Sequence, residues 1–173
     1  MKKIFFILFI SITTYGYTQE FNTGTNVINA GIGFGGSFGN YTTSSQSPSF
    51  SATYERGVWD LPGPGVVSLG AYLGTKSYKY NYTFGNEKWN YTIIGVRGAY
   101  HYTGLEIKNL DIYAGAMLSY NILSYSGNTG NYGSKPSGTA FAGGRWYFTK
   151  TFAGFVEAGY GVAYINLGAS IRF

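Results

Sequence analysis

The feature of this sequence that most limits its fold is an alternation of apolar and polar residues, which recurs from residue 28 to the end of the chain. In one stretch Leu110, Ile112 and Ala114 occupy every second position, and polar residues, tyrosines or glycines fill the positions between such residues. A period of two is typical of a β-strand, whose successive side chains point to opposite faces of the sheet. After residue 20 no stretch shows the repeat of an amphipathic helix. The chain is therefore predicted to be all-β.

Eight segments carry this alternation. They are predicted to be strands over residues 28–38, 49–58, 66–78, 89–102, 110–124, 137–148, 152–160 and 163–173. A tilted β-strand needs about 9–11 residues to cross a membrane, so each segment is long enough to do so. An even number of antiparallel strands places both chain ends on the same side.

The predicted connections differ in length between the two ends of the strands. Turns at 60–65, 103–109 and 149–151 are short, whereas the polar connections at 39–48, 79–88 and 125–135 are mostly longer. The last connection, near Gly161, is short and departs from this pattern. Short turns on one side and longer loops on the other are typical of a membrane-spanning up-and-down barrel.

The composition favours a membrane barrel over a secreted soluble barrel that binds a ligand, which is the alternative. Charged residues make up 11% of the chain, less than half of the roughly 25% in an ordinary soluble domain. One face of the alternation is aliphatic and aromatic, whereas Gly, Ser, Thr and Asn dominate the other. Closure also gives every backbone N–H and C=O a partner, as a hydrocarbon environment requires.

Aromatic residues gather near the ends of the predicted strands, where they match the interfacial belts of membrane barrels. These residues are Phe38, Phe50, Trp89, Tyr100, Tyr102, Trp146, Phe148, Phe152, Tyr160 and Phe173.

The N-terminus is predicted to be an export signal. Lys2 and Lys3 precede an apolar run over residues 4–12. Such a run fits the roughly 7–15 residues of a secretory signal and is shorter than the roughly 20 residues of a spanning helix. Small residues allow cleavage after Gly16 or Thr18, of which we favour Thr18; the alternative is a buried core strand.

Three regions follow from these predictions. They are a signal peptide at 1–18, a short N-terminal segment at 19–25 and an outer-membrane β-barrel at 26–173.

The last strand ends in Phe173, with apolar residues at alternate positions before it. Together with the export segment, the eight alternating segments and the absence of cysteine, it makes residues 26–173 resemble the small outer-membrane β-barrels of Gram-negative bacteria. This superfamily includes the OmpA transmembrane domain and OmpX-like barrels. The resemblance implies an integral outer-membrane protein with both termini in the periplasm, outer-membrane lipids around it, and insertion by the barrel-assembly machinery. The implied assembly signal consists of Tyr164, Leu167, Ala169, Ile171 and Phe173.

Charged residues on the polar face are expected to point into the lumen, because Arg or Lys facing lipid near the midplane costs about 2–4 kcal/mol. The inward residues are Glu55, Lys76, Arg97, His101, Asp111, Arg145, Glu157 and Arg172. We expect a network in which two acids meet two or more arginines, since an unpaired buried charge is very unfavourable. Its candidate members are Glu55, Arg97, Arg145, Glu157, Arg172 and Lys76. Arg56 breaks the pattern and is expected to face lipid and snorkel to the headgroups.

These observations favour a non-enzymatic barrel with an occluded lumen and a structural or surface-interaction role. No cofactor or metal is expected, because the chain has no cysteine and one histidine. The net charge of +5 without a run of Lys or Arg gives no reason to expect nucleic acid binding. The aromatic loop expected at 79–89 is a candidate partner site, or else packs against other loops and headgroups. Alternative functions are a narrow porin-like channel and a lipid-modifying enzyme that uses His101.

Overall fold

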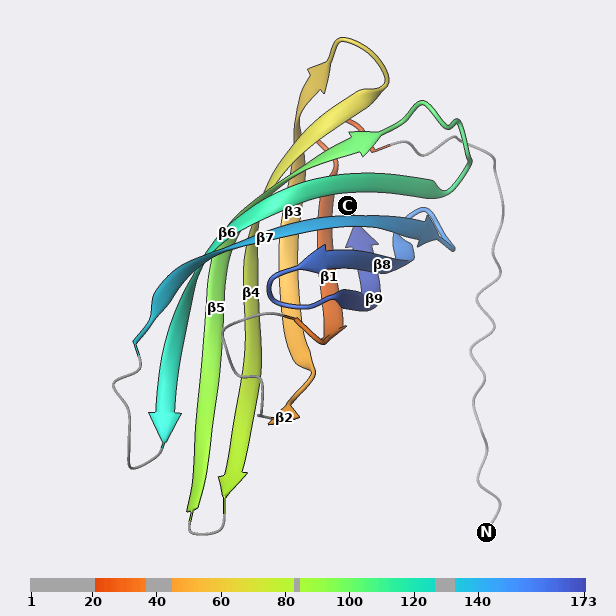
Figure 1. Cartoon of the computed structure of the whole chain (residues 1–173). Helices are drawn as coiled ribbons and strands as arrows, with labels where there is room; N and C mark the ends of the chain where they lie inside the picture. The colour runs from red at the N-terminus through yellow and green to blue at the C-terminus, as the bar shows by residue number, and fades with distance from the viewer. Residues whose placement is uncertain (1–20, 37–44, 83–84, 127–132) are drawn as a thin grey trace, which may run out of the picture.

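The computed structural model describes residues 21–36, 45–82, 85–126 and 133–173. These parts of the chain contain nine β-strands (Figure 1): β1 (Asn26–Phe34), β2 (Ser45–Gln46), β3 (Ser49–Leu61), β4 (Gly65–Tyr82), β5 (Gly85–Tyr102), β6 (Leu110–Ser126), β7 (Lys135–Tyr147), β8 (Phe152–Tyr160) and β9 (Ile165–Arg172). No helix within the described ranges has the length and apolar character needed to cross a membrane.

Eight of the strands close into an antiparallel barrel (Figure 1). Each pairs with its neighbour in the chain, and β1 pairs with both β3 and β9, so that the ring is complete. The two-residue strand β2 pairs only with the end of β4, through Ser45 opposite Lys79. The predicted all-β, eight-stranded up-and-down barrel is therefore confirmed.

The strands match the predicted segments closely, with one clear error. Residues 79–88 were expected to form a loop, but β4 continues to Tyr82 and β5 begins at Gly85. The pairing continues without interruption through Lys79 opposite Lys88 and Tyr80 opposite Glu87. The prediction failed because both faces of this hairpin are polar or aromatic there, whereas backbone pairing needs no apolar alternation.

Smaller differences lie at two other strand ends. β1 ends at Phe34, and the next two residues, Gly35 and Gly36, have positive φ angles, which end a strand and suit glycine. The last strand begins at Ile165 and not at residue 163. Phe38, the expected loop residues 39–44 and the predicted signal peptide lie outside the described residues.

The barrel has an apolar outside and a polar inside. Val96 and Leu118, on the outer face, are 65% and 72% exposed, whereas Glu55 and Arg145, on the inner face, are 0% exposed. A soluble barrel would show the opposite arrangement, because its apolar side chains would be withdrawn from water. Arg56 is exposed on the outer face, as predicted.

Eight of the ten aromatic residues predicted at the strand ends are exposed on the outer face: Phe50, Tyr100, Tyr102, Trp146, Phe148, Phe152, Tyr160 and Phe173. The prediction for Trp89 was wrong. Trp89 is only 4% exposed and belongs to a cluster inside the barrel with Tyr91 and Ile93. These three residues are two positions apart on β5, so they point to the same side.

Inward glycines make room for large side chains in this narrow lumen. A Cβ atom on Gly74 would lie 2.7 Å from the ring of Tyr72, and one on Gly115 would lie 2.8 Å from the ring of Phe141. These rings could not keep their present positions if the glycines carried side chains. The lumen is thus filled by fitted aromatic and polar side chains, as an eight-stranded barrel requires.

Candidate functional site: an ionic network in the lumen

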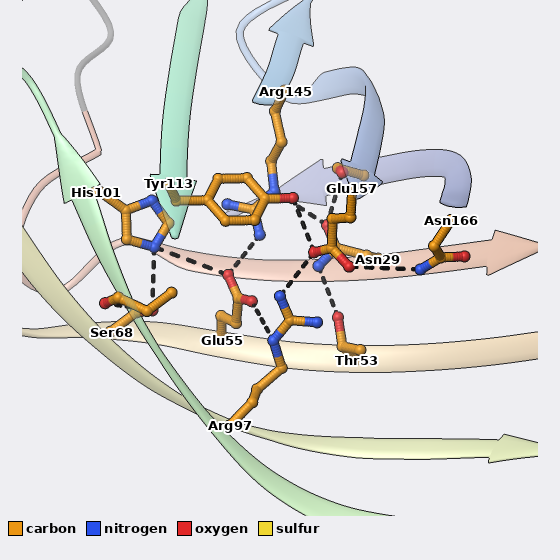
Figure 2. A network of polar contacts seen from close by, with 12 residues as sticks. Asn29, Thr53, Glu55, Ser68, Arg97, His101, Tyr113, Arg145, Glu157 and Asn166 are labelled. Carbon is orange, nitrogen blue, oxygen red and sulfur yellow. Dashed lines mark hydrogen bonds and ion pairs between the residues drawn. The ribbon is translucent and has the colours of Figure 1, made fainter. Parts of the chain in front are cut away.

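Six ionisable side chains meet near the middle of the lumen (Figure 2), and we call them the lumen network: Glu55, Arg97, His101, Asp111, Arg145 and Glu157. They come from β3, β5, β6, β7 and β8, and none is more than 6% exposed. Each lies on the inward face of its strand. The alternation along each strand sets this orientation, and barrel closure brings the strands together.

The two arginines connect three carboxylates. Arg97 forms ion pairs with Glu55 and with Glu157, each with an N–O distance of 2.7 Å. Arg145 pairs with Asp111 at 2.8 Å and with the other carboxylate oxygen of Glu55. Glu55 is therefore shared by both guanidinium groups. Buried charges need such partners, because taking an ion out of water is costly.

Neutral side chains extend the lumen network to the two strands that close the barrel. Asn29 of β1 accepts hydrogen bonds from Arg145 at 3.2 Å and from Ser170 of β9 at 2.6 Å. Tyr113 donates to Glu157 at 2.9 Å, and Asn166 of β9 donates to the second oxygen of Glu157 at 3.5 Å. Together with Ser68 of β4, which approaches His101, side chains from all eight barrel strands are connected.

Aromatic rings cover the arginines. The guanidinium carbon of Arg97 lies 4.0 Å from the ring centre of Phe141, and that of Arg145 lies 4.3 Å from the ring centre of Tyr113. A cation over an aromatic face is attracted by the ring quadrupole, and the attraction is stronger away from water. The rings therefore stabilise the buried charges and also fill the space around them.

His101 connects the lumen network to the end of the barrel at which β1 begins and β9 ends. Its Nδ1 is 2.8 Å from Asp111 Oδ1, and its Nε2 is 3.0 Å from Ser68 Oγ and 3.9 Å from Glu55 Oε2. The three carboxylates outnumber the two guanidinium groups by one.

The hydrogen-bonded arrangement of Ser68, His101 and Asp111 is the one found in serine hydrolases. There the histidine takes a proton from the serine, and the aspartate orients the histidine. Here Ser68 and His101 are both 0% exposed. No substrate carbonyl can reach Ser68 Oγ in this conformation. The described residues also contain no group of three His, Asp or Glu side chains arranged to hold a metal ion.

A small cavity adjoins the lumen network on the side away from His101. It has a volume of about 40 Å³ and is lined in part by Arg97, Glu157, Thr139 and Asn166. A water molecule needs at least about 10–15 Å³ of such space, so the cavity has room for about three. Thr139 Oγ1 and Asn166 Oδ1 are buried without a protein partner, so water there would satisfy them.

Four of the six predicted network residues, Glu55, Arg97, Arg145 and Glu157, come together, and two do not. Lys76 donates instead to the backbone carbonyls of Gly35 and Val162, the latter at 2.7 Å. Its position on β4, farther from the chain ends than Arg97 on β5, places it beyond the reach of the lumen carboxylates.

Arg172 was also wrongly placed in the network. Its Nη2 donates to the carbonyl of Lys150 at 2.8 Å, and its guanidinium carbon lies 4.1 Å from the ring centre of Tyr147. As the last residue of β9, Arg172 lies at the rim of the barrel and not at its middle. Its inward orientation was correctly expected, but orientation alone does not give the height along the barrel.

Sequence reasoning placed Asp111 and His101 on the inward face but left them out of the network. Asp111 is the direct register partner of Arg145 on the neighbouring strand. The length of the connection between β6 and β7 is the sequence signal that could have revealed this contact. It does not give the strand register, however, because the geometry of the loop is unknown from the sequence. Ser68, Asn29 and Tyr113 were missed because small polar residues and tyrosines are common on the inward face.

Three of the five residues of the implied assembly signal lie on the outer face of β9 or just beyond it: Leu167, Ile171 and Phe173 are 44%, 50% and 66% exposed. Ala169 lies between them and is half-buried. Tyr164 is exposed, but it precedes β9, and its ring centre lies 6.3 Å from that of Tyr160.

No protein-family model matches the chain, and no curated protein is significantly similar to it. Among solved structures, the chain is similar to the N-terminal β-barrel domain of Pseudomonas aeruginosa OprF, with 15% identity and a TM-score of 0.47 over 87% of this chain and 98% of that one. It is also similar to the Yersinia pestis outer membrane protein Ail, whose structure was solved in a phospholipid bilayer nanodisc, with 14% identity and a TM-score of 0.45 over 87% and 99%. These likenesses concern the fold alone, and the membrane is inferred below from the barrel's own surface.

Proposed function

We propose that this protein is an integral outer-membrane barrel with an occluded lumen and a structural or surface-interaction role. The observation that carries the proposal is the combination of an apolar, exposed outer face with a buried lumen network. Leu118 on the outside is 72% exposed, whereas Arg145 on the inside is 0% exposed. Only a lipid environment makes such an outer face favourable.

The occlusion follows from what fills the lumen. The two arginines and three carboxylates cross it from strand to strand, and the adjoining cavity has a volume of only about 40 Å³. A space of that size holds a few waters and is no continuous path for a solute. The lumen network therefore serves to fix the strand register and to fill the barrel.

Both chain ends are proposed to lie in the periplasm. The start of β1 is adjacent to Phe173, because Asn26 and Phe173 exchange backbone hydrogen bonds of 3.3 and 3.0 Å. The short turns at 62–64 and 148–151 lie at this end, and the long β4–β5 hairpin projects at the other (Figure 1). That hairpin is the part best placed to meet a surface partner. The exposed outer face of β9 is where we expect the assembly machinery to bind.

The membrane barrel can be tested on the refolded protein in detergent. A folded barrel should give a β-sheet circular dichroism spectrum and should migrate differently in a gel before and after boiling. Insertion into lipid vesicles should protect the outer-face residues from aqueous quenchers. A protein that stays in solution without detergent and shows no change in mobility on boiling would contradict the proposal.

A narrow channel is the second candidate, and the cavity beside Arg97 and Glu157 is the observation in its favour. Exchange of ion-pair partners could connect this cavity to the rest of the lumen. Steady single-channel conductance of the wild-type protein in a planar bilayer would put the channel first. A silent wild type would support the occluded barrel.

We propose no enzymatic activity. The Ser68–His101–Asp111 arrangement is the feature that a hydrolase would use, and it supports the third candidate, an enzyme centred on His101. A His101→Asn variant that folds normally should keep any envelope phenotype. Loss of the phenotype with the fold intact would favour the enzyme.

A further inference from the structure

Residues 21–25, which precede β1, fold back into the end of the barrel at which β1 begins and β9 ends. Phe21 is 2% exposed, and its ring lies parallel to that of His101, with 3.6 Å between ring centres and 5° between planes. Val27 and Val66 complete an apolar cluster around it. A phenylalanine that lies outside the strands of a barrel is ordinarily solvent-exposed unless something holds it.

The barrel wall is shaped to hold this segment. Gly24 donates to the carbonyl of Gly57 at 2.9 Å, and Gly57 donates back to the carbonyl of Thr25 at 3.0 Å. The strand register shifts just beyond Gly57, between Gly57 and Trp59. A Cβ atom on Gly57 would lie 2.4 Å from the carbonyl oxygen of Asn22, so only glycine allows the segment to lie this close.

Two further contacts hold the segment in place. The hydroxyl of Thr23 donates to Asp60 at 2.7 Å. The backbone N–H of Asn22 donates to Thr25 Oγ1 at 3.1 Å across a tight turn. Gly24, within this turn, has a φ angle of +90°, which suits glycine. Pairing with β3, the turn and the aromatic stack therefore act together to seat Phe21.

We propose that residues 21–25 form a stopper, for which the mouth of the barrel is an intramolecular docking site. The ring of Phe21 is what separates the lumen network from periplasmic water. This inference rests on the proposed function, because it takes that mouth to open into the periplasm. It adds that the chain's own residues 21–25 close the mouth, and that Ser68 and His101, both 0% exposed, meet solvent only when the segment undocks.

The immediate surroundings of Phe21 favour a removable element over a permanent part of the core. A cavity of about 20 Å³ lies beside Phe21 and is lined on its other side by the β5–β6 turn, including Leu105 and Ile107. Both of these side chains are nearly half exposed. The ring thus borders a space that leads toward solvent, and no strand has to part for it to leave.

The stopper can be tested with a cysteine reporter, since the natural chain has no cysteine. Ser68→Cys places a thiol that is reached from the mouth only past Phe21, and a charged, membrane-impermeant maleimide measures its accessibility. Labelling of this thiol should be slow with Phe21 in place and faster by about tenfold or more with Phe21→Ala, because local opening controls access.

Three controls separate undocking from general loosening. Phe148→Ala removes an exposed phenylalanine of the outer face and should leave labelling unchanged. Ser119→Cys, a buried position nearer the opposite end, should stay protected in both backgrounds. Gly57→Ala leaves Phe21 in the sequence but blocks its seat, and it should speed labelling of the Ser68→Cys thiol as Phe21→Ala does.

Two results would overturn the stopper. One is rapid labelling of the Ser68→Cys thiol while Phe21 is present. The other is continued protection of that thiol in both Phe21→Ala and Gly57→Ala variants that still shift in mobility on boiling. Absence of the mobility shift in the wild-type protein would overturn the proposed function itself, which distinguishes the two failures.

Discussion

Asp111 and Arg145 are direct register partners on β6 and β7, and their side chains meet in the lumen with 2.8 Å between Oδ2 and Nη1. Through Arg145 this pair continues to Glu55, and from there to Arg97 and Glu157. A local cross-strand pair thus becomes part of a connection that spans the whole barrel. A shift of register between β6 and β7 would break it, which is how the lumen network specifies one arrangement of strands.

Removal of Arg145 should destabilise the barrel strongly. Arg145→Ala leaves Glu55 and Asp111 buried with fewer partners, and breaking a buried pair costs about 3–5 kcal/mol. The free energy of unfolding is measured by urea unfolding in lipid vesicles, with tryptophan fluorescence as the signal. Arg56→Ala is the matched control, because Arg56 is exposed on the outer face. Equal stability of the two variants would show that the lumen network does not stabilise the fold.

The lumen should contain two barriers in series, the Arg97 ion pairs and Phe21. Wild type, Arg97→Ala and Phe21→Ala should each be silent in a planar bilayer, since one barrier remains in every case. The double variant should conduct ions. A conducting Arg97→Ala variant with Phe21 in place would show that the N-terminal segment does not seal the lumen.

Lys76 should stabilise the end of the barrel opposite the start of β1 and the end of β9. Its ammonium group donates to two backbone carbonyls, the partly buried one of Gly35 after β1 and the buried one of Val162 between β8 and β9. Lys76→Met would leave both acceptors without this donor, at about 1–3 kcal/mol each when buried. The midpoint of the heat-dependent mobility shift measures the loss. Lys79→Met, at an exposed position on the same strand, should stay within about 0.5 kcal/mol of wild type. Equal midpoints for the two variants would contradict this role.

Phe173 should matter more for assembly than for stability. Its side chain is 66% exposed on the outer face, so Phe173→Ala should change the unfolding free energy little. If the assembly machinery reads the last strand, the variant should nevertheless insert more slowly in cells or with purified machinery. Phe148→Ala is the control, because Phe148 is 57% exposed on the outer face just after β7. Equal insertion rates of the two variants would show that Phe173 is not part of the assembly signal.

The sequence alone was sufficient for the architecture and for the two faces of each strand. Alternation has a period of two, and a slip of one residue would turn every side chain to the opposite face. Leu118 outside and Arg145 inside could therefore both be predicted. Where the alternation weakens, as along residues 79–88, a strand was mistaken for a loop, because backbone pairing does not depend on side-chain polarity.

Which inward residues meet was decided by the tertiary structure. Glu55 and Arg145 are 90 positions apart, and only the closure and register of the barrel bring them to the same height. The same geometry keeps Lys76 and Arg172 away from the carboxylates, although both point inward. Phe21 precedes the first strand and shows no alternation that could have revealed its place. Local periodicity determines the direction of a side chain, whereas the closed ring determines its neighbours.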